Sequence, residues 1–135
     1  VKDLINKKIK RRESFRPFAP SMILEDKKIW FDNDYENPYM SFIERINENK
    51  KKIVPGVVHV DDTCRLQTVK REDNEIFYNL INSFKKLTGT PMLLNTSFNE
   101  NEPIVNEPSE AIDCFLRTDM DVLVIENLII KKKEQ

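Results

Sequence analysis

Apolar side chains recur at helical spacing in two segments of the chain, and the longer pattern predicts a helix over residues 74–87. Asp73 can cap the first turn of this helix, and Gly89 can cap its last turn. A second helix is predicted from Pro108 to about Thr118, because proline is favoured in the first turn of a helix. The side chains expected to face inward are Ile76, Phe77, Leu80, Ile81, Phe84 and Leu87 in the first helix, and Ala111, Ile112, Phe115 and Leu116 in the second.

Short apolar runs bounded by turn-forming residues predict the strands. Residues 54–69 are predicted to form a hairpin whose two strands meet at residues 61–63. Residues 122–125 and 128–132 are predicted to form a second hairpin, which finishes the sheet. The other predicted strands are residues 22–24, 28–31 and 39–46, the last with Phe42, Ile43 and Ile46 in the core. Together with the helices, this order of elements predicts a mixed α/β fold.

Residues 91–105 combine a short apolar run with a dense polar segment. Residues 92–94 predict a strand buried on both faces, and the side chains that follow cannot belong to a core. In α/β sheets, ligands usually bind at the carboxyl ends of strands, where such side chains can surround a phosphate or a nucleotide. A solvated connector is the alternative interpretation, since the same residue types fill ordinary turns. The polar side chains in question are Asn95, Thr96, Ser97, Asn99 and Asn101.

The first part of the chain is locally basic. Residues 1–12 carry apolar side chains among lysines and predict one or two amphipathic helical turns, whereas Pro17 and Pro20 forbid a regular helix in residues 10–21. Phe15 and Phe18 can anchor this second segment and direct its cations, an arrangement suited to phosphate recognition. A solvated basic loop is again the alternative. The cations concerned are Lys10, Arg11, Arg12 and Arg16.

The length of 135 residues predicts one domain with a single core, and the ordinary shares of charged and hydrophobic residues predict a globular protein. A net charge of −1 predicts no general attraction to nucleic acid or membrane. No apolar run is long enough for a membrane span or a signal peptide, so we expect a cytoplasmic location. Because the chain begins with Val1 and not methionine, we expect it to be part of a longer protein.

The counts of cysteine, histidine and glycine exclude several kinds of site. Cys64 and Cys114 lie far apart without ligand partners, so we expect reduced thiols, no structural zinc and no metal site in this chain. His59 is the single histidine, and a lone histidine in a strand is commonly structural. With two glycines in the chain, neither a dinucleotide-binding fingerprint nor a Walker loop can be written.

Five ordered motifs resemble a known family: RESFRPFAPS, NPYM, HVDDTCRLQTV, FYNLINSFKKLTGTPMLLNTSFN and EPIV. From about Lys10 to Lys132 the chain resembles the C-terminal domain of NodU/CmcH-type carbamoyltransferases. The resemblance implies a YrdC-like fold, which is an open twisted mixed sheet with helices packed on it. It also implies a partner in the same full-length chain, an N-terminal metal-binding domain of the actin-like ATPase class.

In that family the YrdC-like domain uses ATP and carbamoyl phosphate to form carbamoyl-adenylate, and the N-terminal domain then transfers the carbamoyl group to a hydroxyl. The resemblance implies that Mg²⁺ enters with ATP. YrdC-like domains carry a KxR and, far downstream, an SxN, which match Lys10-x-Arg12 and Ser97-x-Asn99. By this resemblance Lys10, Arg12 and Arg65 are expected to be catalytic, and Arg16, His59, Gln67, Asn95, Ser97 and Asn99 are expected to bind substrates.

Three positions depart from the family pattern, which commonly has glycine, alanine and glycine where Asp62, Cys64 and Asn101 stand. The first and third changes reduce backbone freedom near the expected site. Two other functions stay open. One is a regulatory or threonylcarbamoyl-type YrdC-like module that binds RNA or a nucleotide without turnover, and the other is an interaction domain that supports a catalytic partner.

Overall fold

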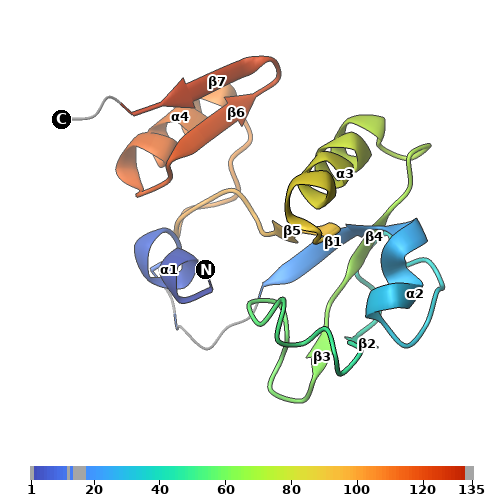
Figure 1. Cartoon of the computed structure of the whole chain (residues 1–135). Helices are drawn as coiled ribbons and strands as arrows, with labels where there is room; N and C mark the ends of the chain where they lie inside the picture. The colour runs from blue at the N-terminus through green and yellow to red at the C-terminus, as the bar shows by residue number, and fades with distance from the viewer. Residues whose placement is uncertain (1, 12, 14–17, 133–135) are drawn as a thin grey trace. The chain divides into compact units, whose positions relative to one another are not determined.

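The computed structural model describes residues 2–11, 13 and 18–132 (Figure 1). These residues form two compact units. The terminal unit combines the two ends of the chain, Val1–Arg16 and Ser97–Gln135, and the central unit is Pro17–Thr96. No helix in the described part of the chain is both long and apolar enough to span a bilayer.

A three-stranded sheet organises the central unit, with β1 (Ala19–Ile23) between β4 (Gln67–Val69) and β5 (Met92–Asn95). β1 is parallel to β4 and antiparallel to β5, so the mixed α/β class is confirmed. The expected strand thus begins before Met22, in spite of Pro20. Proline is tolerated here because Pro20 precedes the residues of β1 that pair with β4, and it has only Leu94 of β5 as a cross-strand partner.

Helix α3 (Glu75–Thr88) lies against this sheet (Figure 1). Its N-cap is Asn74 and not Asp73, because the Asn74 side chain accepts a hydrogen bond of 3.0 Å from the Phe77 amide. Gly89 ends the helix in the left-handed conformation with φ 77°, as expected. The predicted inward face is only partly correct. Ile81 is buried, Phe77 and Phe84 are half-buried, and Ile76, Leu80 and Leu87 are exposed.

The expected strand at residues 28–31 is wrong. A 3₁₀ turn, η1 (Leu24–Asp26), leads into the short helix α2 (Lys27–Trp30). Trp30 and Phe31 are both buried in one cluster, whereas adjacent residues of a strand would point to opposite faces.

The middle of the chain contains less strand than expected. β2 (Glu44–Arg45) pairs with β3 (Thr63–Cys64), and β4 joins the other sheet, so residues 54–69 do not form a hairpin. Phe42 and Ile43 are exposed, and of the three predicted core residues there only Ile46 is buried. Pairing between distant segments overrides the local pattern.

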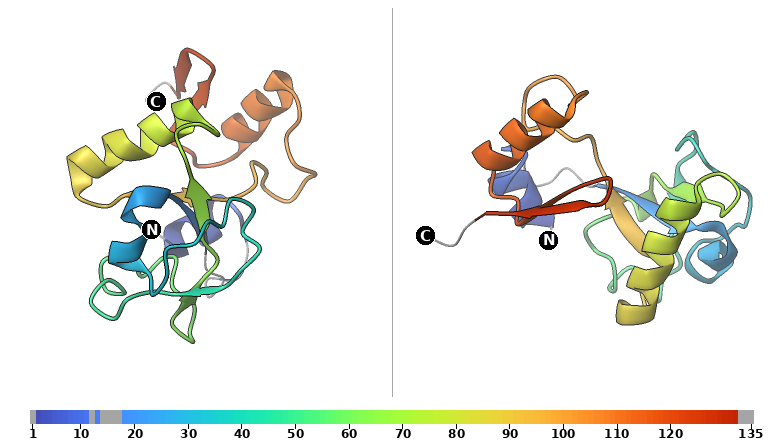
Figure 2. Two further views of the ribbon diagram at one scale, coloured as in Figure 1. Left: turned by 90° about the vertical axis from the view of Figure 1, so that its right-hand side faces the viewer. Right: turned by 90° about the horizontal axis from the view of Figure 1, so that it is seen from above.

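The terminal unit contains α1 (Lys2–Lys8), α4 (Pro108–Arg117), β6 (Val122–Ile125) and β7 (Leu128–Lys131). α4 begins with a capping box between Glu107 and Glu110 and lies on the β6–β7 hairpin (Figure 2). This hairpin is confirmed, but it forms its own two-stranded sheet and does not finish the central one. The inward face of α4 is Ala111, Cys114 and Phe115, whereas Ile112 and Leu116 are exposed, contrary to expectation.

The expectation of a single core is wrong for the described residues. Their buried apolar side chains form three clusters, two in the central unit and one in the terminal unit. The terminal cluster is built on Ala111, Phe115 and Leu123. Each unit therefore has apolar packing of its own.

Candidate functional site

Lys10 and the loop Ser97–Asn99 come together in the terminal unit. The Lys10 side chain is buried, with 4% of the residue exposed, and its Nζ lies 2.5 Å from the Ser97 carbonyl oxygen, 2.7 Å from the Asn99 carbonyl oxygen and 2.8 Å from Asn99 Oδ1. Ser97 Oγ is a fourth oxygen, at 3.4 Å. Three close oxygens are as many as an ammonium group has hydrogens to donate. Lys10 therefore holds the loop in place by charge-assisted hydrogen bonds.

The loop also closes on itself. Ser97 Oγ donates to Asn99 Oδ1 over 2.7 Å, and Asn99 Nδ2 donates to the Glu102 carbonyl oxygen over 2.7 Å. Asn99 Oδ1 thus accepts from both Lys10 and Ser97. The Lys and Ser-x-Asn parts of the two expected motifs form one hydrogen-bonded group, although 87 positions separate Lys10 from Ser97.

Next to this loop, carboxylates surround Arg117. Its guanidinium contacts Glu100 at 3.0 Å, Glu102 at 3.0 Å and Asp113 at 2.9 Å. Arg11, expected to help bind phosphate, instead pairs with Glu100 at 2.8 Å. Arg12 and Arg16, together with the anchor Phe15, lie outside the described residues.

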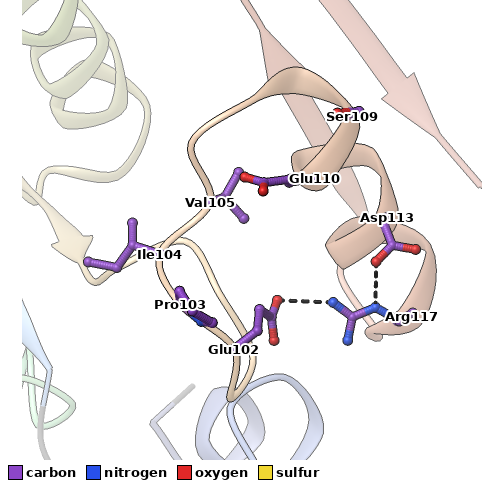
Figure 3. A pocket seen from close by; sticks show the side chains of 8 residues that line it. All are labelled: Glu102, Pro103, Ile104, Val105, Ser109, Glu110, Asp113 and Arg117. Atoms are coloured by element: carbon purple, nitrogen blue, oxygen red, sulfur yellow. Dashed lines mark hydrogen bonds and ion pairs between the residues drawn. The ribbon is translucent and has the colours of Figure 1, made fainter.

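A cavity of about 500 Å³ adjoins this cluster (Figure 3). Glu102 and Asp113 point toward Arg117 on one side of it, and Ile104 belongs to its apolar wall. Hydrogen bonds from its own amide, from neighbouring amides and from the Cys114 thiol lower the pKa of Glu102 to about 2, against an opposing effect of desolvation. Burial, followed by the contact with Glu102, raises the pKa of Cys114.

In the central unit, Gln67 and Asn95 are engaged with each other and with Ser21. Gln67 Oε1 accepts from Ser21 Oγ at 2.6 Å and from Asn95 Nδ2 at 2.7 Å, and Asn95 Nδ2 also lies 3.0 Å from Ser21 Oγ. Gln67 Nε2 donates to the Pro38 carbonyl oxygen over 3.1 Å. These three side chains link β4, β1 and β5, and Gln67 also lines a cavity of about 530 Å³.

His59 precedes the turn that leads into β3, and Arg65 follows β3. His59 Nδ1 lies 3.2 Å from Thr63 Oγ1, and this hydroxyl donates to Asp61 over 2.6 Å. The hydrogen bonds that Asp61 accepts from the Thr63 hydroxyl and from the Thr63 amide lower the pKa of Asp61. The Arg65 side chain is exposed and makes no ion pair with any described residue, so its guanidinium is free to contact a ligand.

The two positions where the family commonly has glycine differ in backbone conformation. Asp62 has φ 65°, in the left-handed region that glycine adopts most readily, and its carboxylate pairs with Lys51 at 2.8 Å. The φ of Asn101 is not positive, so a side chain at this position causes no backbone strain. Cys64 is a buried free thiol, as expected, and burial raises its pKa to about 12, with a further contribution from Glu44. Cys114 is likewise free and buried.

The sequence gives no sign of a buried ion pair in the central unit. Lys27 Nζ lies 2.6 Å from Glu44 Oε2, and both side chains are fully buried. Asn37 Nδ2 donates to Glu44 over 2.9 Å, and the Asn37 amide donates to Thr68 Oγ1 over 2.7 Å. This network connects α2 and β2 to the strand that carries Gln67. Among the residues of this network, Asn37 is the one that the sequence singled out, as part of the NPYM motif.

The model of one protein family, Carbamoyltransferase C-terminus, matches residues 1–132. The chain belongs to this family. It is 48% identical to nodulation protein NolNO of Sinorhizobium fredii, over 98% of this chain and 20% of that protein. It is also 48% identical to nodulation protein NolO of Bradyrhizobium diazoefficiens, over 98% of this chain and 25% of that protein.

A third relative is named for an activity. It is the 3'-hydroxymethylcephem-O-carbamoyltransferase of Amycolatopsis lactamdurans, 37% identical over 83% of this chain and 21% of that protein. The chain thus spans about a fifth to a quarter of the length of the curated relatives it matches.

Proposed function

We propose that this domain binds ATP and carbamoyl phosphate and forms carbamoyl-adenylate for O-carbamoyl transfer by a longer, cytoplasmic carbamoyltransferase. The observation that carries the proposal is the contact of Lys10 with Ser97 and Asn99, because the lysine of one expected motif and the Ser-x-Asn of the other join in one hydrogen-bonded group. Membership in the carbamoyltransferase C-terminus family supports the reaction class. The YrdC-like character of the fold is part of the same proposal.

The chemistry requires fixed positive charge and hydrogen-bond donors. Adenylation develops negative charge on the α-phosphate and on the departing pyrophosphate, and preorganised donors stabilise such charge best. Lys10 supplies the fixed positive charge, because its buried ammonium is held in place by the loop oxygens that take its hydrogen bonds. Ser97 and Asn99 would hold the nucleotide beside it, together with Arg12 and Arg16. Mg²⁺ would enter with the phosphates of ATP.

The carbamoyl phosphate end is assigned to His59 and Arg65. Arg65 supports this assignment because its guanidinium is exposed and has no carboxylate partner among the described residues. A planar guanidinium can donate two hydrogen bonds at once to a phosphoryl group. Gln67 and Asn95 would line the site through Asn95 Oδ1 and the second N–H of Gln67 Nε2, since their other polar groups are bonded to Ser21, to each other and to the Pro38 carbonyl.

The test is ATP–pyrophosphate exchange that depends on carbamoyl phosphate. Arg65→Ala should reduce the exchange rate about ten- to a hundredfold, since a hydrogen bond to a charged group contributes about 1.5–3 kcal/mol. Arg45→Ala is the matched control, because Arg45 belongs to the same unit, is also exposed and makes no ion pair with a described residue. Equal exchange in both variants would remove Arg65 from the site. Nucleotide binding without any exchange would indicate a non-catalytic module instead.

A further inference from the structure

The two strands of the β6–β7 hairpin are apolar on both faces. β6 reads Val-Leu-Val-Ile and β7 reads Leu-Ile-Ile-Lys, with no alternation between apolar and polar residues. A strand with one solvated face normally alternates, and a continuous apolar run is typical of a strand covered on both sides. The sequence of the hairpin therefore predicts that both of its faces are covered by other residues.

The described residues of the terminal unit cover one face of the hairpin. The register pairs Leu123 with Ile130, and these two side chains pack with α4. The register also pairs Val124 with Ile129 on the opposite face, where they are 62% and 69% exposed. Val122, 43% exposed, and Lys131 form the next pair on that side. We call the surface formed by Val122, Val124, Ile129 and Lys131 the outer face.

The relatives are much longer than the segment that this chain matches. The family model is that of a C-terminus, and the matching segment makes up 20–25% of the two nodulation proteins. Most of each of those chains therefore precedes the segment. A preceding part joins the domain at α1, which belongs to the same compact unit as β6 and β7. A covalent connection within one unit gives the outer face a high effective concentration of that partner.

We infer that the outer face is the surface on which the preceding part of a carbamoyltransferase chain docks. The surface that covers it is apolar and carries a carboxylate opposite Lys131, because Lys131 is the one charged member of the face. The exposed residues Ile76, Leu80 and Leu87 of α3 belong to the central unit, which lacks the direct connection. The inference depends on family membership and not on the proposed nucleotide chemistry.

The test is photo-crosslinking in a full-length enzyme. In a chimera, this chain replaces the matching segment of NolO from Bradyrhizobium diazoefficiens, with which it shares 48% identity. The photoreactive amino acid p-benzoylphenylalanine is placed at Val124, or as the matched control at Leu80, which is 55% exposed on α3. Illumination requires neither ATP nor carbamoyl phosphate, so the result is independent of exchange activity. Mass spectrometry identifies the crosslinked peptides.

We expect the probe at Val124 to crosslink to peptides from the preceding part, with at least fivefold higher yield than the probe at Leu80. Adding Ile129→Lys should lower the yield from Val124 at least fivefold. Crosslinks from Val124 to a second copy, or only to peptides of this domain, or to nothing, would overturn the inference. If the chimera does not accumulate as folded protein, the probes are placed at the aligned positions of NolO itself. The results that support or overturn the inference are then the same.

Discussion

Lys10 is the residue whose observed environment adds most to its expected role. Its ammonium group is buried and lies close to oxygens of Ser97 and Asn99, so it shapes the polar loop from inside. A ligand that takes hydrogen bonds from Lys10 competes with these loop oxygens. Lys10 thus holds the loop in its conformation. In the proposed function, a bound phosphate would take some of these hydrogen bonds from the loop.

Replacing Lys10 with methionine should loosen this loop. Lys10→Met retains most of the side-chain volume but removes the charge-assisted hydrogen bonds to the Ser97 and Asn99 carbonyl oxygens, and such bonds contribute about 1.5–3 kcal/mol to the free energy of unfolding. Hydrogen exchange at the amides of Ser97–Asn99 should become faster, and affinity for ATP should fall. The control is Lys86→Met, because Lys86 is exposed on α3. Exchange rates in the loop that match the wild type would show that Lys10 does not hold it.

The sequence named candidate residues for the site, but it did not indicate their contacts. The pairing of Lys10 with Ser97-x-Asn99 came from the family resemblance, and the structure brings these residues together. Gln67 and Asn95 were expected to face a substrate, yet they bind Ser21 and each other across 28 to 74 positions of sequence. Such partners depend on strand register, which no local pattern specifies.

Helices were easier to predict than strands because their hydrogen bonds are local. α3, α4 and the Gly89 cap follow from spacing and capping residues within a few positions. β2 and β3 have two residues each and exist only through pairing with each other. α2 replaces an expected strand because Lys27, at its start, is buried against Glu44 of a distant segment.

Two substitutions test which residue caps the N-terminus of α3. Asn74→Ala should lower the free energy of unfolding by about 1 kcal/mol, since the Phe77 amide loses its side-chain acceptor. Asp73→Ala should change it by less than about 0.5 kcal/mol, because Asp73 makes only a weak, exposed ion pair with Lys70 at 4.0 Å. Urea denaturation of both variants provides the measurement. A larger loss in Asp73→Ala would restore Asp73 as the cap.

The division into two units separates the kinds of interaction that stabilise the molecule. In the central unit a fully buried ion pair, Lys27 with Glu44, lies among apolar clusters. In the terminal unit a small apolar cluster is accompanied by ion pairs in which Glu100 and Glu102 bind Arg117. The length and composition of the chain gave no indication of this division, because both units draw residues from an evenly mixed sequence.

Acid should therefore destabilise the terminal unit through Glu102. Its pKa in the folded protein is about 2, below its ordinary value of 4.5, so its stabilising contribution is complete above 4.5 and is lost as the pH falls toward 2. Glu102→Gln should lower the free energy of unfolding at neutral pH and have a smaller effect at about pH 3. Hydrogen exchange in α4 and β6 reports on this unit.

The control is Glu72→Gln, which removes an exposed carboxylate of the central unit. This variant should leave exchange in α4 and β6 unchanged at both pH values. An effect of Glu102→Gln that is as large in acid as at neutral pH would contradict the assignment of the acid response to Glu102.

The position of β1 in the sheet has a consequence for synthesis of the chain. β1 is the central strand, yet both of its neighbours follow it in sequence, and β5 ends about 70 residues after it. At roughly 5–20 residues per second, a ribosome needs roughly 4–14 s to make that stretch. Until then the strand Ala19–Ile23, which is buried along its whole length in the folded chain, lacks one of its partners and is open to association with other nascent chains. This exposed interval ends only when residues 92–95 have left the ribosome and can pair with β1.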